Sequence, residues 1–258
     1  MDYMQGKIIQ LICLFFFIST AQSGSISEIT ASNFYKNFEV SAAGGPNWFN
    51  THNTHLIISP YETDSNNQIT NISNNGAWKV GVGYYFDNQW SQYPFLNSVL
   101  FEVNVYGISA TVHGSVDQYE LAQFNNYSFA AQTNSTRVMF DFKSNLYTWR
   151  QTSFYPILGV GTTWDTTSYK ETAIQTDISQ DSALILGNHT NSQIAWDVGV
   201  GINIAYFQYL HITAEYVYAF LGYGSAAQSS ANDVLLSTPP SFSYQTQSLL
   251  FGISLNFK

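Results

Sequence analysis

Alternating apolar and polar residues are the most regular feature of the chain. In residues 248–257 (SLLFGISLNF) every second residue from Leu249 to Phe257 is aliphatic or aromatic, and the residues between them include Gly252, Ser254 and Asn256. Because successive side chains of a β-strand point to opposite faces, this segment has one wholly apolar face. The same alternation predicts seven further strands, over residues 37–48, 77–86, 97–108, 136–143, 154–164, 193–206 and 211–222.

The eight predicted strands have the length, about ten residues, that a tilted strand needs to cross a bilayer. A soluble sandwich also alternates, but here large aromatic residues recur on one face while charges and glycines stand on the other. Lipid-facing apolar side chains and an interior of small or polar ones explain this pattern directly. An even number of strands also closes the sheet without an edge. The sequence therefore predicts an all-β fold, an eight-stranded antiparallel up-and-down transmembrane β-barrel.

Between the strands, long polar connections alternate with short ones. The long connections follow the first, third, fifth and seventh strands, and they are predicted as loops over about 49–75, 112–135, 165–191 and 223–242. Long extracellular loops and short periplasmic turns are typical of such barrels, so both chain termini are expected in the periplasm. Binding residues concentrate in exposed loops on rigid frames, and we expect function there.

The first 23 residues have the pattern of a secretory signal peptide. Lys7 precedes an apolar run over residues 8–18, and small residues follow, so cleavage before Gln22 and cleavage before Gly24 fit equally well. A membrane anchor would need a longer apolar run, and lipoprotein processing at Cys13, the one cysteine, fits poorly after Ile12. The predicted organisation is a signal peptide (1–23), a periplasmic tail (24–36) and a barrel domain (37–258).

The composition agrees with a membrane barrel and argues against nucleic-acid binding. Aromatic residues make up 17% of the chain and charged residues only 10%, against about 25% charged in typical soluble domains. The net charge is −9, with 8 basic residues in all. Phosphate backbones require clustered Lys and Arg, so no nucleic-acid partner is expected.

The predicted faces send eight charged side chains into the barrel interior: Glu39, Lys79, Glu102, Arg137, Asp141, Lys143, Asp197 and Glu215. A one-residue slip would move all of them into lipid, so the register is strongly specified. An eight-stranded barrel is only wide enough inside for side chains. We expect these charges to pair as a structural network, beside inward tyrosines such as Tyr85, Tyr106 and Tyr155. The alternative is a gated ion path in which a salt bridge forms the gate.

Several segments resemble the small outer-membrane barrels that include the transmembrane domain of outer-membrane protein A and the opacity-type surface proteins. They are NFEVSAAGGPNW, FYPILGVGTTW, WDVGVGINIAY and HITAEYVYAF, together with the aromatic Phe257 that resembles the terminal assembly signal, although Lys258 follows it here. The resemblance implies a bacterial outer-membrane location and contact with membrane lipid, lipopolysaccharide and the barrel-assembly machinery. It also implies possible host or envelope ligands, bound through the loops. We expect no peptidoglycan-binding domain after the barrel.

Catalytic and metal signals are weak. His113, Gly114 and Ser115, with Glu120 nearby, resemble the His-x-Ser pair of barrels that deacylate lipid A, but Val116 stands where that family usually has Asn. A histidine that activates a serine and is oriented by a carboxylate is the chemistry that acyl transfer requires. His52 and His55 are spaced for a metal but lack further ligands nearby. We therefore predict a structural or adhesion-type surface protein without catalysis, metal or cofactor; the alternatives are a narrow ion channel and a lipid A-modifying enzyme.

Overall fold

The computed structural model describes residues 37–257 except 52–54, 60–61, 88–97, 175–182 and 230–234. The predicted signal peptide, the predicted tail, His52 and Lys258 lie outside the described residues, and the side chain of His55 is not described either. No helix in the described part is long and apolar enough to cross a membrane.

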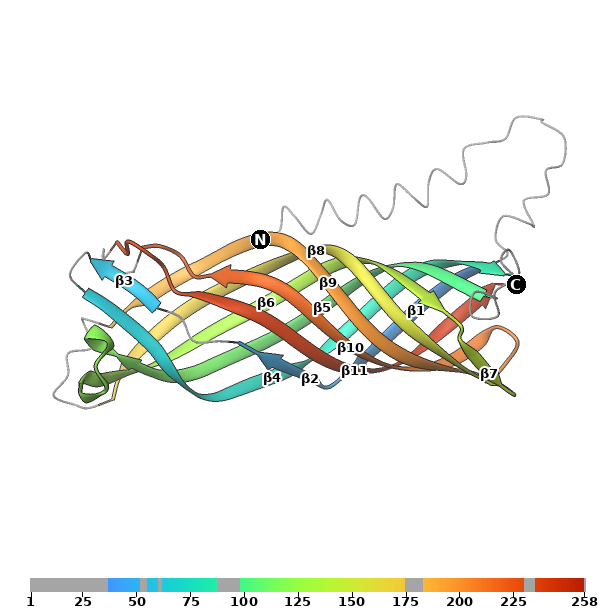
Figure 1. Ribbon diagram of the computed structural model, residues 1–258, viewed down its shortest axis with the longest axis horizontal. Coiled ribbons are helices and arrows are strands. Elements are labelled where there is room, and N and C mark those ends of the chain that lie inside the picture. Colours follow the sequence, from blue (N-terminus) through green and yellow to red (C-terminus); the bar gives the residue numbers. More distant parts are fainter. Residues whose placement is uncertain are drawn as a thin grey trace, which may run out of the picture. The chain divides into compact units, whose positions relative to one another are not determined.

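Within the described residues, eight long antiparallel strands form one closed ring (Figure 1). Their bounds are β1 (Phe38–Gly45), β4 (Glu62–Asp87), β5 (Ser98–Asp117), β6 (Asn125–Ser144), β8 (Thr152–Ala173), β9 (Ile185–Ala205), β10 (Leu210–Ser225) and β11 (Ser241–Phe257). Neighbours along the chain pair with one another, and β1 closes the ring because Phe38 lies opposite Phe257 on one side and Tyr84 on the other. The predicted eight-stranded up-and-down barrel is confirmed.

Short elements complete the wall. Strand β2 (Asn47–Asn50) continues the line of β1 along β11, and β3 (His55–Ser59) pairs with the start of β4. Strand β7 (Tyr147–Trp149) forms a hairpin with β8 at the end of the barrel where β11 finishes, which we call the inner end (Figure 1). Two 3-10 turns, η3 (Gln118–Glu120) and η4 (Ala122–Phe124), join β5 to β6 at the opposite, outer end.

An apolar belt surrounds the inner part of the barrel. It includes Val82, Phe140, Leu158, Val198 and Phe251, whose side chains are between 43% and 64% exposed. A continuous exposed apolar surface of this kind is unfavourable in water and suits the hydrocarbon of a bilayer. The barrel therefore spans a membrane with its strands.

Aromatic side chains mark both edges of the belt. Near the inner end, edge-to-face contacts run from Phe38 to Tyr84, Phe86, Phe101 and Phe142, crossing four neighbouring strands. Toward the outer edge stand the exposed tryptophans Trp48, Trp78 and Trp196. Such aromatic girdles at the two membrane interfaces are typical of outer-membrane barrels. The fold thus places the chain in an outer membrane.

The loop predictions were wrong over much of their length. Strand β4 already begins at Glu62. Strand β5 continues to Asp117 and β6 starts at Asn125, while β8 continues to Ala173 and β9 starts at Ile185. Most of the predicted second loop, and the parts of the third loop that flank its undescribed centre, are therefore barrel wall. The fourth prediction is closest, because β10 ends at Ser225 and β11 starts at Ser241.

The physical reason is a reversal of side-chain polarity along each strand. Strand β5 shows it: outward residues change from Phe101 and Val103 to Ser109 and Thr111, while inward residues change from Glu102 and Asn104 to Ala110 and Val112. The alternation persists past the belt, but its apolar members face inward and its polar members face outward. A search for outward apolar rows therefore ends at the membrane surface, although the strand continues.

Candidate functional site

The structure places all eight of the predicted interior charges inside the barrel, each at most 5% exposed. They stand on inward positions of β1, β4, β5, β6, β9 and β10, and the pleat sets their direction. Four of them, Lys79, Glu102, Lys143 and Glu215, form one cluster, which we call the charge quartet. The others lie around it at neighbouring levels.

The charge quartet is closely paired. The Lys143 Nζ atom lies 2.6 Å from Glu102 Oε2 and 2.7 Å from Glu215 Oε1. The Lys79 Nζ atom lies 2.6 Å from Glu215 Oε2 and 3.8 Å from Glu102 Oε2. Two positive and two negative groups thus alternate around a square without net charge. Ser41 also donates a hydrogen bond to Glu102, and Tyr155 donates one of 3.0 Å to Glu215.

Asp141 and Asp197 are less completely paired. Asp141 Oδ2 accepts hydrogen bonds of 2.7 Å from both Asn104 and Tyr106. Asp141 Oδ1 and Asp197 Oδ1 lie side by side above Gly159, within 2.3 Å of where a Cβ on that glycine would stand. Within the described residues neither oxygen of Asp197 has a hydrogen-bond partner. Arg137, which stacks 4.3 Å from the Tyr106 ring centroid, and Lys79 are the cations near Asp197.

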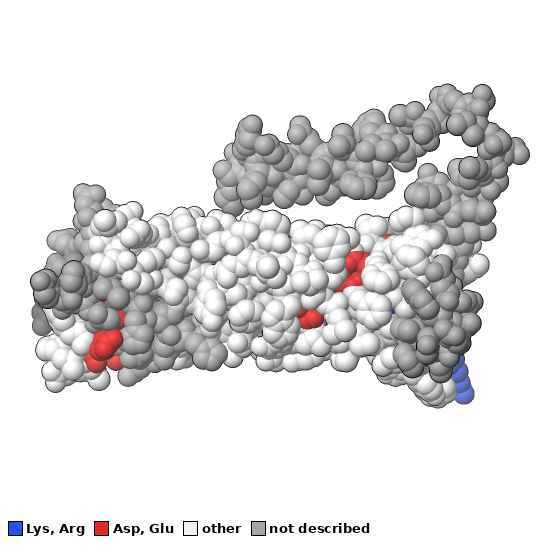
Figure 2. All heavy atoms as spheres, turned by 45° about the horizontal axis from the view of Figure 1, so that its top comes forward, with Lys and Arg blue, Asp and Glu red and all other residues white. Residues whose placement is uncertain are grey.

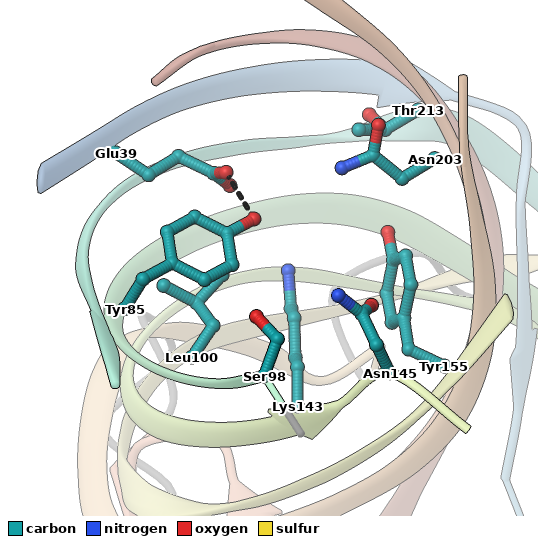
Figure 3. Close-up of a pocket in the computed structure, with 9 residues that line it drawn as sticks. All are labelled: Glu39, Tyr85, Ser98, Leu100, Lys143, Asn145, Tyr155, Asn203 and Thr213. Atoms are coloured by element: carbon teal, nitrogen blue, oxygen red, sulfur yellow. Dashed lines mark hydrogen bonds between the residues drawn. The ribbon is translucent and has the colours of Figure 1, made fainter. Parts of the chain in front are cut away.

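The interior narrows to a small cavity at the inner end (Figure 3). Glu39 accepts a 2.6 Å hydrogen bond from the Tyr85 hydroxyl, Lys143 points into the same space, and Asn203 and Thr213 stand across from Glu39. The cavity volume of about 10 Å³ is just enough for one water molecule. The lumen here is filled with side chains.

At the outer end the interior is apolar. Large side chains from several strands and connections, each at most 4% exposed, pack there as an outer core: Val112, Val116, Tyr127, Phe129, Tyr169, Leu184, Leu186, Leu221, Leu236 and Phe242. Phe129 and Tyr169 stack with ring centroids 5.5 Å apart. Below this core, the Tyr244 hydroxyl bonds Thr133 at 2.9 Å and Thr167 at 2.8 Å. The outer half of the barrel is therefore packed like a soluble β-barrel.

Several carboxyl groups are buried in the outer half of the barrel, and Glu171 lies against the outer core. Glu171 is 3% exposed, and it accepts hydrogen bonds of 2.8 Å from the Tyr169 hydroxyl and 3.0 Å from the Leu184 amide. Burial raises the pKa of Glu171 to about 7, and the nearby Asp64 carboxylate adds to the rise. Both effects disfavour the charged form.

The turn that joins β5 to β6, residues 117–126, is the second feature of the outer end, and we call it the outer tip. Its crest exposes Tyr119, Leu121 and Phe124 by 53%, 45% and 40%. Asn125 donates a 2.8 Å hydrogen bond to Asp117, and Asn126 donates a 2.7 Å hydrogen bond to Gln118. The exposed aromatic residues thus stand on a hydrogen-bonded base.

The three catalytic candidates lie on β5 and in the turn that follows it. His113 and Ser115 project from the outer face of β5, two residues apart, which separates their Cα atoms by roughly 6.6 Å. Glu120 lies beyond them in the exposed turn η3. No group of three or more His, Cys, Asp or Glu side chains in the described residues is arranged to hold a metal.

Sequence reasoning missed the outer core and the outer tip. The signal for the outer core was present in residues 127–133, where Tyr127, Phe129 and Ala131 alternate with Ser128, Ala130 and Gln132. It was hidden because its apolar face points opposite to that of the membrane belt. Nothing in the local pattern predicts the tip, since its shape depends on contacts with β4.

No family model and no curated protein matches the sequence. Among solved structures, the chain is similar to Neisserial surface protein A, at 13% identity, covering 86% of this chain and 98% of that one with a TM-score of 0.36. The chain is also similar to the attachment invasion locus protein of Yersinia pestis, at 13% identity, covering 86% of this chain and 99% of that one with a TM-score of 0.31. The outer membrane protease OmpT from Escherichia coli is similar at 9% identity, covering 92% of this chain and 99% of that one with a TM-score of 0.34.

Proposed function

We propose that the protein acts by contact at the bacterial surface, with the extended outer half of the barrel serving as a rigid stalk. The observation that carries this proposal is the outer core. A wall that continues ten residues past Gly107 on β5 would rise roughly 25 Å above the belt at a tilt near 40°. A packed apolar interior makes this projection stiff, which favours presentation of a fixed surface over a flexible loop.

The polar exterior of the stalk supports the same proposal. Outward residues above the belt are mainly hydroxyl and amide side chains, such as Ser109, Asn134, Thr166 and Thr190. The Thr166 and Thr190 hydroxyls hydrogen-bond across two strands at 2.8 Å. Such a wall suits water and the sugars of lipopolysaccharide, so it would hold the outer end clear of the membrane.

The test is a barrel from which the β5–β6 and β8–β9 parts of the stalk are removed. Ser109 lies opposite Asn134, and Thr166 lies opposite Thr190, so each pair can be joined by a two-residue Asn-Gly turn without changing the strand register. Bacteria displaying the intact or the shortened barrel would be compared for retention on protein films, on hydrophobic glass and on other cells, with detergent sensitivity as a measure of envelope integrity. Heat-dependent gel mobility would verify that the shortened barrel is folded.

We expect the shortened barrel to lose retention while the envelope stays intact. Equal retention by both barrels would contradict the stalk proposal. An envelope defect that appears only when the whole barrel is deleted would instead place the function in the membrane-embedded half.

A narrow ion path is the second candidate, favoured by the ionised charge quartet in the lumen. The outer core stands against it, because water and ions would have to cross a packed apolar layer. We further propose that the protein is not an enzyme: His113 and Ser115 lie on the outer wall, apart from the buried charges. His113→Ala and Ser115→Ala should then leave lipopolysaccharide acylation unchanged; acyl release by the parent protein that both variants abolish would contradict this.

A further inference from the structure

The outer tip departs from the chemistry of the wall that carries it. The outward side chains of β5 and β6 above the belt are mostly Ser, Thr, Asn and Gln, whereas the crest of the tip presents Tyr119, Leu121, Ala122 and Phe124 around Glu120. Tyr119 and Phe124 contact each other edge to face, with centroids 6.1 Å apart. The Ile174 side chain, 52% exposed, stands at the base, where its amide donates a 2.9 Å hydrogen bond to the Asn126 carbonyl. An apolar cluster on an otherwise polar surface is typical of an interaction site.

The tip is held in one conformation. Tyr119 and Glu120 have φ angles of 55° and 58°, in the left-handed region that side chains other than glycine rarely occupy. The Tyr119 amide donates a 3.0 Å hydrogen bond to the buried Asp64 carboxylate on β4, which fixes the strained turn to the barrel wall. Backbone strain of this kind persists only where surrounding contacts enforce it, and it clusters at functional sites. A surface that is already ordered loses little entropy on binding.

Charge narrows the choice of partner. Figure 2 shows one patch of acidic side chains at the outer end, on the left of the view, and further acidic atoms along the barrel. Glu120 lies exposed at the centre of the tip, and Lys170 is an exposed cation on the neighbouring wall. The whole chain carries a net charge of −9. At the crest of the tip, the Glu120 carboxylate disfavours anionic lipid and a second copy of the same tip by like charge, while it attracts a cationic group.

We propose that the outer tip docks a cationic protein surface that bears an apolar pocket, with Leu121 and Phe124 entering the pocket and Glu120 pairing with a basic group at its edge. This inference rests on the proposed contact function and names the chemistry of the partner. Aromatic and aliphatic anchors that are surrounded by a charged rim carry most of the binding energy in protein interfaces.

The experiment uses the purified full barrel in nanodiscs of zwitterionic lipid. Binding would be measured to immobilised copolymers of Lys with Phe, of Lys with Ser and of Glu with Phe, and to zwitterionic and anionic vesicles. The Lys and Phe copolymer supplies both predicted features, and each other probe lacks at least one. We expect binding to the Lys and Phe copolymer to exceed binding to every other probe by about tenfold or more.

Two tip variants separate the contribution of the apolar anchors from that of the Glu120 charge. Leu121→Ser with Phe124→Ser should reduce binding of the Lys and Phe copolymer by about tenfold, and Glu120→Lys should reduce it similarly. Leu235→Ser is the matched control, because Leu235 is also apolar, 67% exposed and in an outer connection, but lies in a different turn. The control should bind as the parent barrel does.

The outcomes distinguish this inference from the stalk proposal. Copolymer binding that survives both tip variants but is lost in the shortened barrel would overturn the tip assignment and leave the stalk proposal standing. Binding that survives in the shortened barrel would overturn both. Equal binding to all probes, preference for vesicles, or self-association of the barrel that Leu121→Ser with Phe124→Ser abolishes would overturn the predicted partner chemistry.

Discussion

The charge quartet shows how this barrel keeps ionised groups inside a narrow lumen. Removing a charged group from water costs several kcal/mol, and only close opposite charges with further hydrogen bonds compensate for it. Lys143 meets both carboxylates of the quartet within 2.7 Å. Ser41 donates to the other oxygen of Glu102, and Tyr155 is a second donor to Glu215 Oε1. The four residues are therefore interdependent, and the loss of one leaves an uncompensated charge.

We predict that Glu102→Gln lowers the free energy of unfolding by about 3 to 5 kcal/mol, because Lys79 and Lys143 are then left with the single carboxylate of Glu215. Urea unfolding in phospholipid vesicles, followed by gel mobility, measures this. Adding Lys79→Met restores charge balance and should recover part of the loss. The control, Glu120→Gln, changes an exposed carboxylate; a Glu102→Gln barrel as stable as that control would show that the quartet contributes nothing.

We predict from the raised pKa of Glu171 that the stability of the outer end depends on pH. Its pKa is about 7 in the folded barrel, against about 4.3 in an open chain, so the folded state holds a proton that the open state releases between these values. The stabilisation is complete below about pH 4.3 and is lost as the pH rises through 7. The free energy of local opening should therefore fall by about 2 kcal/mol from pH 5.5 to pH 8.

Hydrogen exchange near β8 and Leu184, corrected for the intrinsic effect of pH, checks this. Burial also raises the pKa of Asp165 on β8 to about 6, so Glu171→Gln should remove the pH dependence above about pH 6.5 and leave the part that Asp165 contributes below it. Glu120→Gln should leave the whole dependence intact. The same dependence in the Glu171→Gln barrel would assign it to another group.

Each long strand consists of two segments: its outward side chains are apolar within the belt and polar above it. On β8, Val160 and Thr166 both point outward, but Val160 is 56% exposed within the apolar belt and Thr166 stands above it among hydroxyl side chains. The same substitution should therefore have different effects at the two positions.

We predict that Val160→Lys lowers the free energy of unfolding into vesicles by about 2 to 4 kcal/mol, the effect of a lysine near the bilayer midplane, whereas Thr166→Lys changes it by less than about 1 kcal/mol. The matched pair uses one strand, one face and one new residue. Equal losses at both positions would mean that the belt extends past Trp164 and that the polarity reversal does not mark the membrane surface.

The reversal also explains what could be predicted from the sequence. The membrane segments of all eight strands were predicted because residues such as Phe140 and Asp141 alternate with a large apolar side chain outward. For the outer segments the sequence predicts loops, because Ser, Thr and Asn are common in both turns and water-facing strands. Pairings such as Lys79 with Glu215, which are 136 residues apart and meet across the lumen, depend on ring closure and have no local signal. The outer tip depends likewise on the contact between Tyr119 and Asp64.

In the molecule as a whole, two kinds of packing follow one another along the barrel axis. The inner half has a polar lumen closed by ion pairs, and the outer half has an apolar core. A conducting path would have to pass both, and the cavity at the inner end has room for about one water molecule.

We therefore predict that the barrel reconstituted in a planar bilayer shows no discrete single-channel openings at neutral pH, and that Glu102→Ala does not create them because the outer core remains closed. Joining Ser109 to Asn134 and Thr166 to Thr190 removes the part of the outer core that β5, β6, β8 and β9 supply, and this barrel provides the comparison. Openings in the parent barrel that Glu102→Ala alters would support the ion-path alternative.

The polarity reversal has one more consequence, for the position of the protein along the membrane normal. A shift of the barrel by one residue pair would bring Ser109 and its neighbours into hydrocarbon on one side or lift Trp78 and Trp196 out of the interface on the other. Both shifts are unfavourable, so the polarity reversal fixes the position of the barrel along the membrane normal to within a few ångströms. The outer tip is consequently carried at a set height, and whatever meets it must reach down to that height through the sugar layer.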